Sequence, residues 1–151
     1  MSIQVNIQNV TKAHVPSHEE LEQWAALVFS ARRKKGAIGV RIVGEKEIQS
    51  LNHQFRKVDN PTNILSFPYE DVVDEENVPI LGDLAVCASV VKKEAIAQKK
   101  ELIAHWAHLI IHGCLHLQGY THNDEENAKR METKEIQLLK KLGFKNPYQS
   151  N

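Results

Sequence analysis

The chain of 151 residues is poor in cysteine, net charge and long apolar runs, the features that would assign it to a specialised class of protein. It has only two cysteines, Cys87 and Cys114, too few for a disulfide framework and consistent with a reducing compartment. Its 19 Lys and Arg balance 19 Asp and Glu, so net charge does not point to nucleic acid or membranes. No apolar run approaches the roughly 18 residues of a membrane span. Because its N-terminus also lacks the build of a signal peptide, we expect a soluble, cytoplasmic protein.

The composition that remains is that of an ordinary globular protein, with 42% hydrophobic and 25% charged residues. Without a linker or an internal repeat, the sequence predicts a single domain over residues 1–151. Strand-like and helix-like patterns are interleaved without a strict βαβ repeat, which predicts an α+β fold with one roughly four-stranded mixed β-sheet packed by helices. We expect strands at about 3–7, 37–43, 64–67 and 81–87. We expect helices that begin near Ser17, Glu45, Ser89, Glu101 and Asn123, with ends at Gly36, Gly119 and Gly143. Ser17 with Glu20 and Asn123 with Glu126 are expected capping boxes, and Ser89 is an expected helix cap.

Histidine is the residue in excess. The chain has eight histidines, and five of them lie between residues 105 and 122. Within that stretch, HGCLHLQGYTH (residues 112–122) has the form H-x3-H-x2-G-x2-H. His112 and His116 are one helical turn apart, so their side chains project from the same face of a helix. Gly119 can end that helix in the left-handed conformation and let the chain turn back, which brings His122 towards the same point.

Three imidazoles around one point are typical of a catalytic zinc site, because the fourth coordination position stays open for water. Such a metal supplies hydroxide at neutral pH. We therefore predict one Zn²⁺ per chain, held by His112, His116 and His122. Cys114 lies about 200° around the helix from the two helical histidines, so we expect it to face away from the metal as a small buried hydrophobe.

His105 and His108 extend the histidine stripe towards the start of the same helix. Two interpretations remain open for them. They could line the site or form hydrogen bonds that orient the ligands. They could equally be ordinary histidines that pack beneath the sheet.

The same histidine spacing occurs in metzincin-type proteases, so a metzincin-like zinc peptidase is one alternative. Those enzymes need a glutamate directly after the first histidine as general base, and this chain has Gly113 there. They also place a methionine in a turn below the metal, whereas Met131 falls inside an expected helix. The sequence therefore argues against a peptidase.

Four segments together resemble the YbeY family of bacterial metal-dependent endoribonucleases. They are NHQFRKVDNPTNILSFP (52–68), LGDLAVC (81–87), HWAHLIIHG (105–113) and HGCLHLQGYTH (112–122). The resemblance implies a zinc-dependent, single-strand-specific endoribonuclease that acts in ribosomal RNA processing, at the 3′ end of the small-subunit RNA, and in ribosome quality control. It implies single-stranded and ribosomal RNA and ribosomal particles as partners, and neither membranes nor DNA.

The resemblance also carries residues over to this chain. The metal ligands of the family fall on His112, His116 and His122, and its functionally important arginine falls on Arg56, which is the predicted catalytic residue. Its guanidinium suits the charge that phosphodiester cleavage builds on phosphate oxygens, provided that the loop expected to carry it folds towards the metal. The chain departs from the family at Thr121, where an aspartate is usual. A remaining alternative is a non-catalytic ribosome-assembly factor with structural zinc, against which the open coordination position argues.

Positive charge is clustered locally even though the net charge is zero. The clusters lie at residues 32–35, 92–93 and 99–100. Basic clusters of this kind can follow an RNA backbone, but lysines at helix ends also complement the helix dipole. Both interpretations stay open for each cluster.

Overall fold

The computed structural model of the protein describes residues 2–30 and 35–149, and within these ranges it contains one four-stranded sheet and five helices. The strands are β1 (Ser2–Asn9), β2 (Lys35–Val43), β3 (Ile64–Pro68) and β4 (Ile80–Cys87). The helices are α1 (His18–Phe29), α2 (Glu45–Arg56), α3 (Ala88–Ala97), α4 (Leu102–Leu117) and α5 (Glu125–Lys141). The predicted α+β class with a mixed sheet is confirmed.

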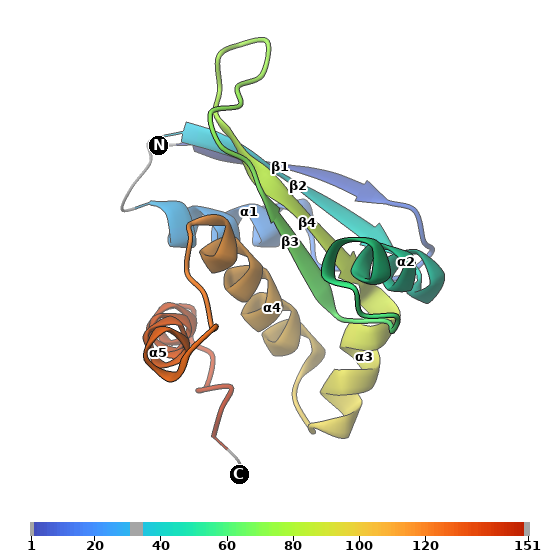
Figure 1. Cartoon of the computed structure of the whole chain (residues 1–151). Helices are drawn as coiled ribbons and strands as arrows, with labels where there is room; N and C mark the ends of the chain where they lie inside the picture. The colour runs from blue at the N-terminus through green and yellow to red at the C-terminus, as the bar shows by residue number, and fades with distance from the viewer. Residues whose placement is uncertain (1, 31–34, 150–151) are drawn as a thin grey trace.

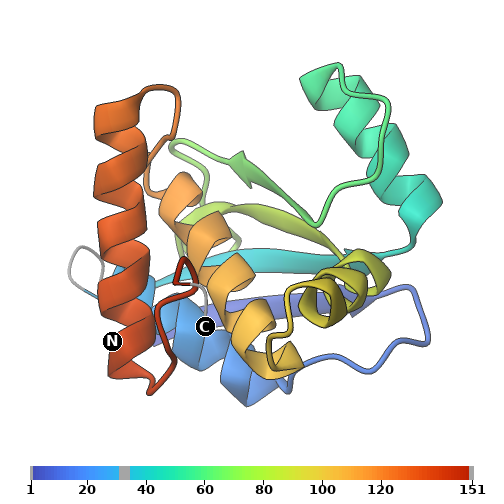
Figure 2. The same cartoon turned by 90° about the horizontal axis from the view of Figure 1, so that it is seen from below.

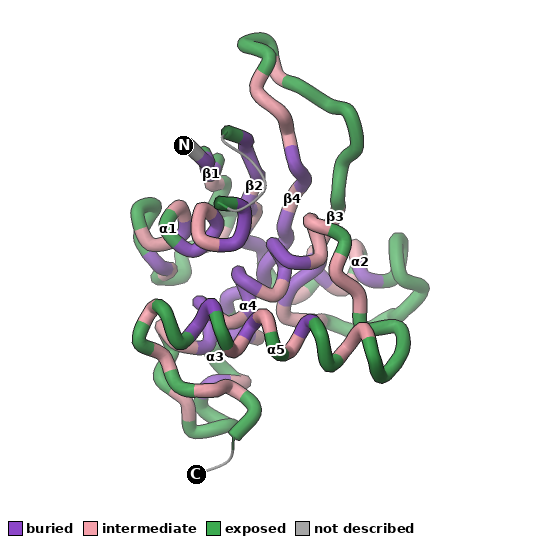
Figure 3. The backbone as a smooth tube through the Cα atoms, turned by 90° about the vertical axis from the view of Figure 1, so that its left-hand side faces the viewer, coloured by how far each residue is buried: buried purple, intermediate pink, exposed green. Residues whose placement is uncertain are grey.

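The sheet has the strand order β1-β2-β4-β3. The first three of these strands are parallel to one another, and β3 runs antiparallel to β4. β3 therefore forms one edge of the sheet, and β4 is its only partner strand within the described ranges. The loop between β3 and β4 projects beyond the sheet and is largely exposed (Figure 3).

Helices cover both faces of the sheet (Figure 1). α1 and α4 pack on one face, where the larger core forms. α2 lies on the other face over a smaller apolar cluster, whose buried members are Val43, Ile48, Leu65, Ala85 and Cys87. Seen from below, α5 runs beside α4, and α2 stands at the opposite side of the molecule (Figure 2). α4 thus lies between the sheet and α5.

Because α4 is covered on both sides, it is apolar around most of its circumference. Trp106, Ile110 and Leu115 are among its fully buried side chains. Among the helices of the described ranges, none has both the length and the apolar character that crossing a membrane requires.

The first helix begins as predicted and ends earlier than predicted. The Ser17 hydroxyl accepts a hydrogen bond from the Glu20 N–H, and the Glu20 carboxylate accepts one from the Ser17 N–H, so the capping box is present. The prediction that Gly36 ends this helix is wrong, because α1 ends at Phe29 and Gly36 lies in β2. A Cβ atom at position 36 would lie 2.8 Å from Leu81 Cδ1, so this glycine permits close approach of a core side chain.

Two other predicted helix starts are also displaced. Ser89 does not cap α3, because β4 runs directly into the helix and the N-cap residue is Cys87. The Ser89 hydroxyl instead donates a hydrogen bond to Glu45 at 2.9 Å. At α5 the cap is Asp124 rather than Asn123, and its carboxylate accepts the Asn127 N–H at 2.8 Å. Both residue types are good caps, so the path of the preceding loop decides between them.

Candidate metal centre

Gly113 sets how α4 lies on the sheet. A Cβ atom there would be 2.9 Å from both Ile64 Cδ1 and Leu84 Cδ2, so the glycine lets the helix approach β3 and β4 closely. The Ser66 hydroxyl also donates to the Gly113 carbonyl at 3.4 Å. Position 113 therefore faces the apolar core, and a glutamate there would be buried among aliphatic side chains. This geometry leaves no place for the general base that a metzincin-type peptidase needs.

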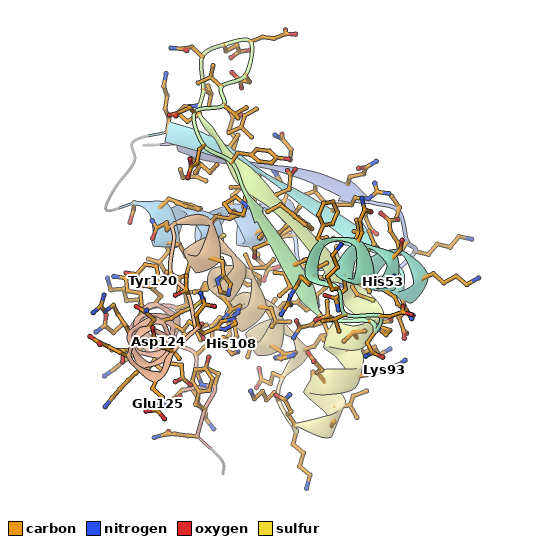
Figure 4. All side chains as sticks on the ribbon, viewed as in Figure 1. His53, Lys93, His108, Tyr120, Asp124 and Glu125 are labelled. Carbon is orange, nitrogen blue, oxygen red and sulfur yellow. The ribbon has the colours of Figure 1, made fainter. Side chains whose placement is uncertain are left out.

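The end of α4 turns the chain back as the sequence predicts. Gly119 adopts a φ of +103°, and the Tyr120 N–H donates to the Leu115 carbonyl at 3.1 Å. The reversal carries His122 back towards the helix end. Figure 4 shows Tyr120 and Asp124 of this returning loop on the same side of the molecule as His108 of α4.

The structure brings the three predicted ligands together. Each of His112, His116 and His122 offers a ring nitrogen, and these three nitrogens lie within 4.8 Å of one another. His122 is exposed, whereas the two helical histidines are half-buried. Among the described residues, this is the only group of three or more His, Cys, Asp or Glu side chains arranged to hold a metal ion.

The hydrogen bonds of the two helical histidines decide which ring nitrogens are free. His112 Nδ1 lies 2.7 Å from a Glu135 carboxylate oxygen, and His116 Nδ1 lies 2.9 Å from the Tyr120 carbonyl oxygen. Both partners are acceptors, so each Nδ1 carries the proton and donates it. The Nε2 atoms then carry lone pairs, and they face each other at 3.1 Å.

Two lone pairs at that separation repel each other unless a cation lies beside both. Two nitrogens bound to one tetrahedral zinc at 2.0–2.1 Å stand about 3.3 Å apart, close to what is found here. Burial and the neighbouring His112 lower the pKa of His116 to about 4, so its imidazole is neutral and available to a metal at neutral pH. The donor set therefore fits a divalent metal ion.

Glu135 of α5 supports this cluster and is fully buried. Its two oxygens accept hydrogen bonds from His112 and His108, each at 2.7 Å, and the Tyr148 hydroxyl donates to it as well. Burial acts to raise the pKa of Glu135, but the hydrogen bonds from His108 and His112 outweigh it and hold the pKa at about 2. A charged carboxylate thus fixes the orientation of His112.

Sequence reasoning missed Glu135, although a signal for it exists. It lies on the apolar side of α5, four residues after Met131 and three before Leu138, both of which are buried. An acid at a core position of an amphipathic helix requires a buried partner. Its partners come from α4, so the sequence pattern alone does not identify them.

The two remaining histidines of the stripe turn out differently. His108 shares Glu135 with His112 and so belongs to the support of the cluster. His105 is buried, and its Nε2 atom lies 2.9 Å from a Glu94 carboxylate oxygen, which also accepts from Asn63. Burial lowers the pKa of His105, and Glu94 only partly opposes that shift. His105 therefore ties α3 and β3 to α4 and does not extend the metal cluster.

Cys114 faces the core, as the helical geometry predicts. It is fully buried, and burial raises the pKa of its thiol to about 12. A neutral thiol in an apolar core is a poor metal ligand and a poor nucleophile. Cys114 therefore does not close the coordination position that three histidines leave open.

Arg56 is the last residue of α2, not part of a loop, which corrects the expectation for its surroundings. The helix ends there because Lys57 adopts a left-handed φ of 63°. The side chain of Arg56 is exposed and forms no hydrogen bond or ion pair with any residue that the structure describes. His53, one turn earlier in α2, lies across β3 from His108 in Figure 4. α2, which ends at Arg56, packs over the smaller apolar cluster, whereas α4 packs on the opposite face of the sheet, so the two helices lie on opposite sides of β3.

The residues of the three basic clusters differ in their contacts and exposure. Residues 32–34 of the first cluster lie outside the described residues. Lys93 pairs with Glu45 at 3.0 Å, and Lys100 donates to the Pro147 carbonyl at 2.9 Å, so these two lysines join elements of the fold. Lys92 and Lys99 are exposed.

Comparisons with known proteins agree with one another. The family model described as "Endoribonuclease YbeY" matches residues 6–143. A curated protein of that name from Pseudomonas fluorescens is 46% identical over 147 residues, which cover 97% of this chain and 96% of the relative. The solution structure of TM1509 from Thermotoga maritima superposes with a TM-score of 0.63 and 24% identity, over 97% of this chain and 99% of that one. At that identity, the similarity to TM1509 supports the fold alone.

Proposed function

The chain belongs to the YbeY family of endoribonucleases, and from this premise we propose that it cuts single-stranded RNA with one zinc ion held by His112, His116 and His122. The observation that carries the zinc site is the 3.1 Å approach of the Nε2 atoms of His112 and His116, whose Nδ1 atoms lie against the acceptors Glu135 and the Tyr120 carbonyl. The substrate we propose is ribosomal RNA, at the 3′ end of the small-subunit RNA. We further propose that the protein acts in the cytoplasm, in the maturation and quality control of ribosomal particles. In this proposal residues 1–151 form a single domain.

Bound zinc supplies a Lewis acid for a phosphate oxygen at neutral pH. The residues around the histidine cluster orient the ligands that would hold the metal. Glu135 and the Tyr120 carbonyl hold the His112 and His116 rings with their Nε2 atoms directed at the site. The exposed His122 completes the set from the loop after α4, and three protein ligands leave one position open.

We assign Arg56 the role of stabilising charge on the phosphate that is cut. Its side chain is exposed at the end of α2 and is not engaged by any described acid. A guanidinium stays charged at all relevant pH values and can bind two phosphate oxygens at once. RNA that crosses the β3 edge could therefore meet the metal on one side and Arg56 on the other.

The alternatives are less well supported. A peptidase of the metzincin type lacks its base, because position 113 is buried against Ile64 and Leu84. A non-catalytic factor with structural zinc would be expected to close the metal with a fourth side chain. The described residues offer no fourth His, Cys, Asp or Glu to this group.

The test is digestion of an unstructured RNA, the same RNA as a duplex, and casein by identically purified proteins. We expect wild-type protein to carry about one zinc and to cut the unstructured RNA only. His116→Ala should lose zinc and activity, whereas His14→Ala, which changes an exposed histidine outside the cluster, should keep both. Zinc-dependent digestion of casein with RNA left intact, or RNA cleavage that survives in zinc-free His116→Ala, would overturn the proposal.

A further inference from the structure

Phe55 is an exposed aromatic side chain that the fold holds in place. It is 55% exposed, more than any other Phe, Tyr or Trp side chain in the described ranges. Its ring nevertheless packs against Phe67 of β3, with centroids 5.1 Å apart and planes at 70°. Phe67 is half-buried and packs on the smaller apolar cluster beneath α2. The Phe55 ring is therefore supported from one side while much of its surface is left to solvent.

The ring and the helix that carries two of the proposed metal ligands contact the same edge strand, β3. Side chains alternate along β3, so Leu65 and Phe67 face α2, whereas Ile64 and Ser66 face α4. Ser66 contacts the Gly113 carbonyl, one residue after His112. Consecutive residues of one edge strand thus support the aromatic ring on one side and the metal-bearing helix on the other.

Positive charge accompanies the ring. Arg56 directly follows Phe55, and Lys57 ends the helix. Both are exposed, and neither forms an ion pair with an acid in the described part of the chain. Exposed aromatic rings beside cationic side chains are what single-stranded nucleic acid requires, since bases stack on the rings and phosphates meet the cations.

We propose that Phe55 is a stacking platform for one unpaired base of the RNA substrate, supported by Phe67 and flanked by Arg56. The inference rests on the proposed function and extends it to substrate selection. Bases in a duplex are stacked on one another and present no free face, so only a single strand can cover the ring. The platform therefore supplies a physical reason for cutting single strands, and it places the base near Arg56 while the backbone crosses β3.

The first experiment compares kcat and KM on a short unstructured RNA for wild type, Phe55→Ala and Phe55→Tyr. Losing one base stack should raise KM by about 5- to 150-fold in Phe55→Ala. Phe55→Tyr keeps the aromatic face and should stay near wild type. The matched control is Ile96→Ala, because Ile96 of α3 is 70% exposed and should contribute nothing. Zinc content and melting temperature should be unchanged in all variants.

A second experiment identifies the stack directly. Abasic sites are placed one at a time along the RNA, and a single position should raise KM for the wild type. In Phe55→Ala the same abasic site should cost nothing further, because the two changes remove one interaction. Phe55→Trp adds a fluorescence reading, since a stacked base quenches an exposed indole while the native Trp24 and Trp106 are buried.

The outcomes separate the two proposals. If wild type cuts RNA and Phe55→Ala has the wild-type KM, the platform is overturned and the proposed function stands. If Phe55→Ala has a lower melting temperature, and its KM exceeds that of the wild type by the same factor whichever position of the RNA is abasic, Phe55 is a structural residue. The platform is then again overturned. If wild type neither binds nor cuts unstructured RNA, the proposed function fails first, and the platform fails with it.

Discussion

At the scale of single residues, we expect Arg56 to affect the rate of RNA cleavage and not the stability of the fold. Its side chain is exposed and unengaged by described partners, so removing it should leave the structure intact. Losing one preorganised contact to developing charge typically costs about 10²–10³ in rate. We expect Arg56→Ala to lose that factor in kcat while keeping its zinc and melting temperature. Arg56→Lys should recover only part of it, because lysine lacks the planar fork.

Cleavage of a short single-stranded RNA measures this, with zinc content and melting temperature determined on the same preparations. Lys46→Ala, which removes an exposed cation near the other end of α2, serves as a matched control for nonspecific loss of charge. Wild-type cleavage by Arg56→Ala would reduce the active site to the metal alone. Loss of zinc in that variant would make Arg56 structural.

Glu135 acts at the same scale but through another residue. It is a positioning residue, since it accepts hydrogen bonds from His112 and His108 and is not itself one of the grouped ligands. Glu135→Gln keeps the shape of the side chain and removes its charge, so the hydrogen bond that holds the His112 ring is weakened. We expect zinc affinity to fall about 10- to 100-fold, as for other hydrogen-bond partners of metal-binding histidines.

Competition with a chromogenic zinc chelator gives that affinity. Glu126→Gln is the matched control, because Glu126 lies on the same helix, is 85% exposed in its side chain and forms an ion pair with the exposed Arg130. Unchanged zinc affinity in Glu135→Gln would show that His112 is oriented by packing alone.

At the scale of elements, the correction at the start of α5 can be tested. Asp124 caps the helix through its carboxylate, and Asn123 lies just outside it. Asp124→Ala should therefore lower the free energy of unfolding by about 1 kcal/mol, whereas Asn123→Ala should change it far less. Because both positions adjoin His122, unfolding by urea is measured with chelator present for wild type and both variants. Equal losses, or a larger loss for Asn123→Ala, would contradict the observed cap.

The sequence was informative where structure is local. The capping box of Ser17 and the reversal at Gly119 follow from contacts within a few residues, and both were predicted. The spacing of His112 and His116 places both on one face of α4 for the same reason. The exact cap of α5 was missed, because two residues of equal propensity stand side by side.

Contacts between distant elements were beyond the reach of periodicity. Glu135 meets His112 across 23 residues, and Phe55 meets Phe67 only after the intervening loop returns beneath α2. Nothing in the local pattern specifies either partner. Gly36 shows the opposite error: a glycine that suits a helix end is used instead for close packing against Leu81 in the sheet.

At the scale of the whole molecule, the reactivity of the two cysteines measures whether the core on each face of the sheet stays closed. Cys87 belongs to the cluster beneath α2 and Cys114 to the core beneath α4, so they sample opposite faces of the sheet. Both are fully buried, and burial raises the pKa of the Cys114 thiol to about 12. Neither thiol can react with a water-soluble disulfide reagent unless its face of the sheet opens.

We therefore expect both thiols to be protected in the folded protein and to react together once it unfolds, as measured by the absorbance of the released thiolate. Zinc held by the three histidines as proposed would join α4 to the loop before α5, so it should stabilise the folded state by mass action. Removing it with a chelator should speed the reaction of Cys114 more than that of Cys87, because two of the three proposed ligands lie on α4, the helix that carries Cys114, and none lies in the cluster that holds Cys87. Cys87→Ser and Cys114→Ser assign each rate. A thiol that reacts at the rate of a free cysteine before unfolding would show that its side of the core is open. If removal of zinc accelerates the reaction of both thiols equally, zinc stabilises the sheet as a single unit.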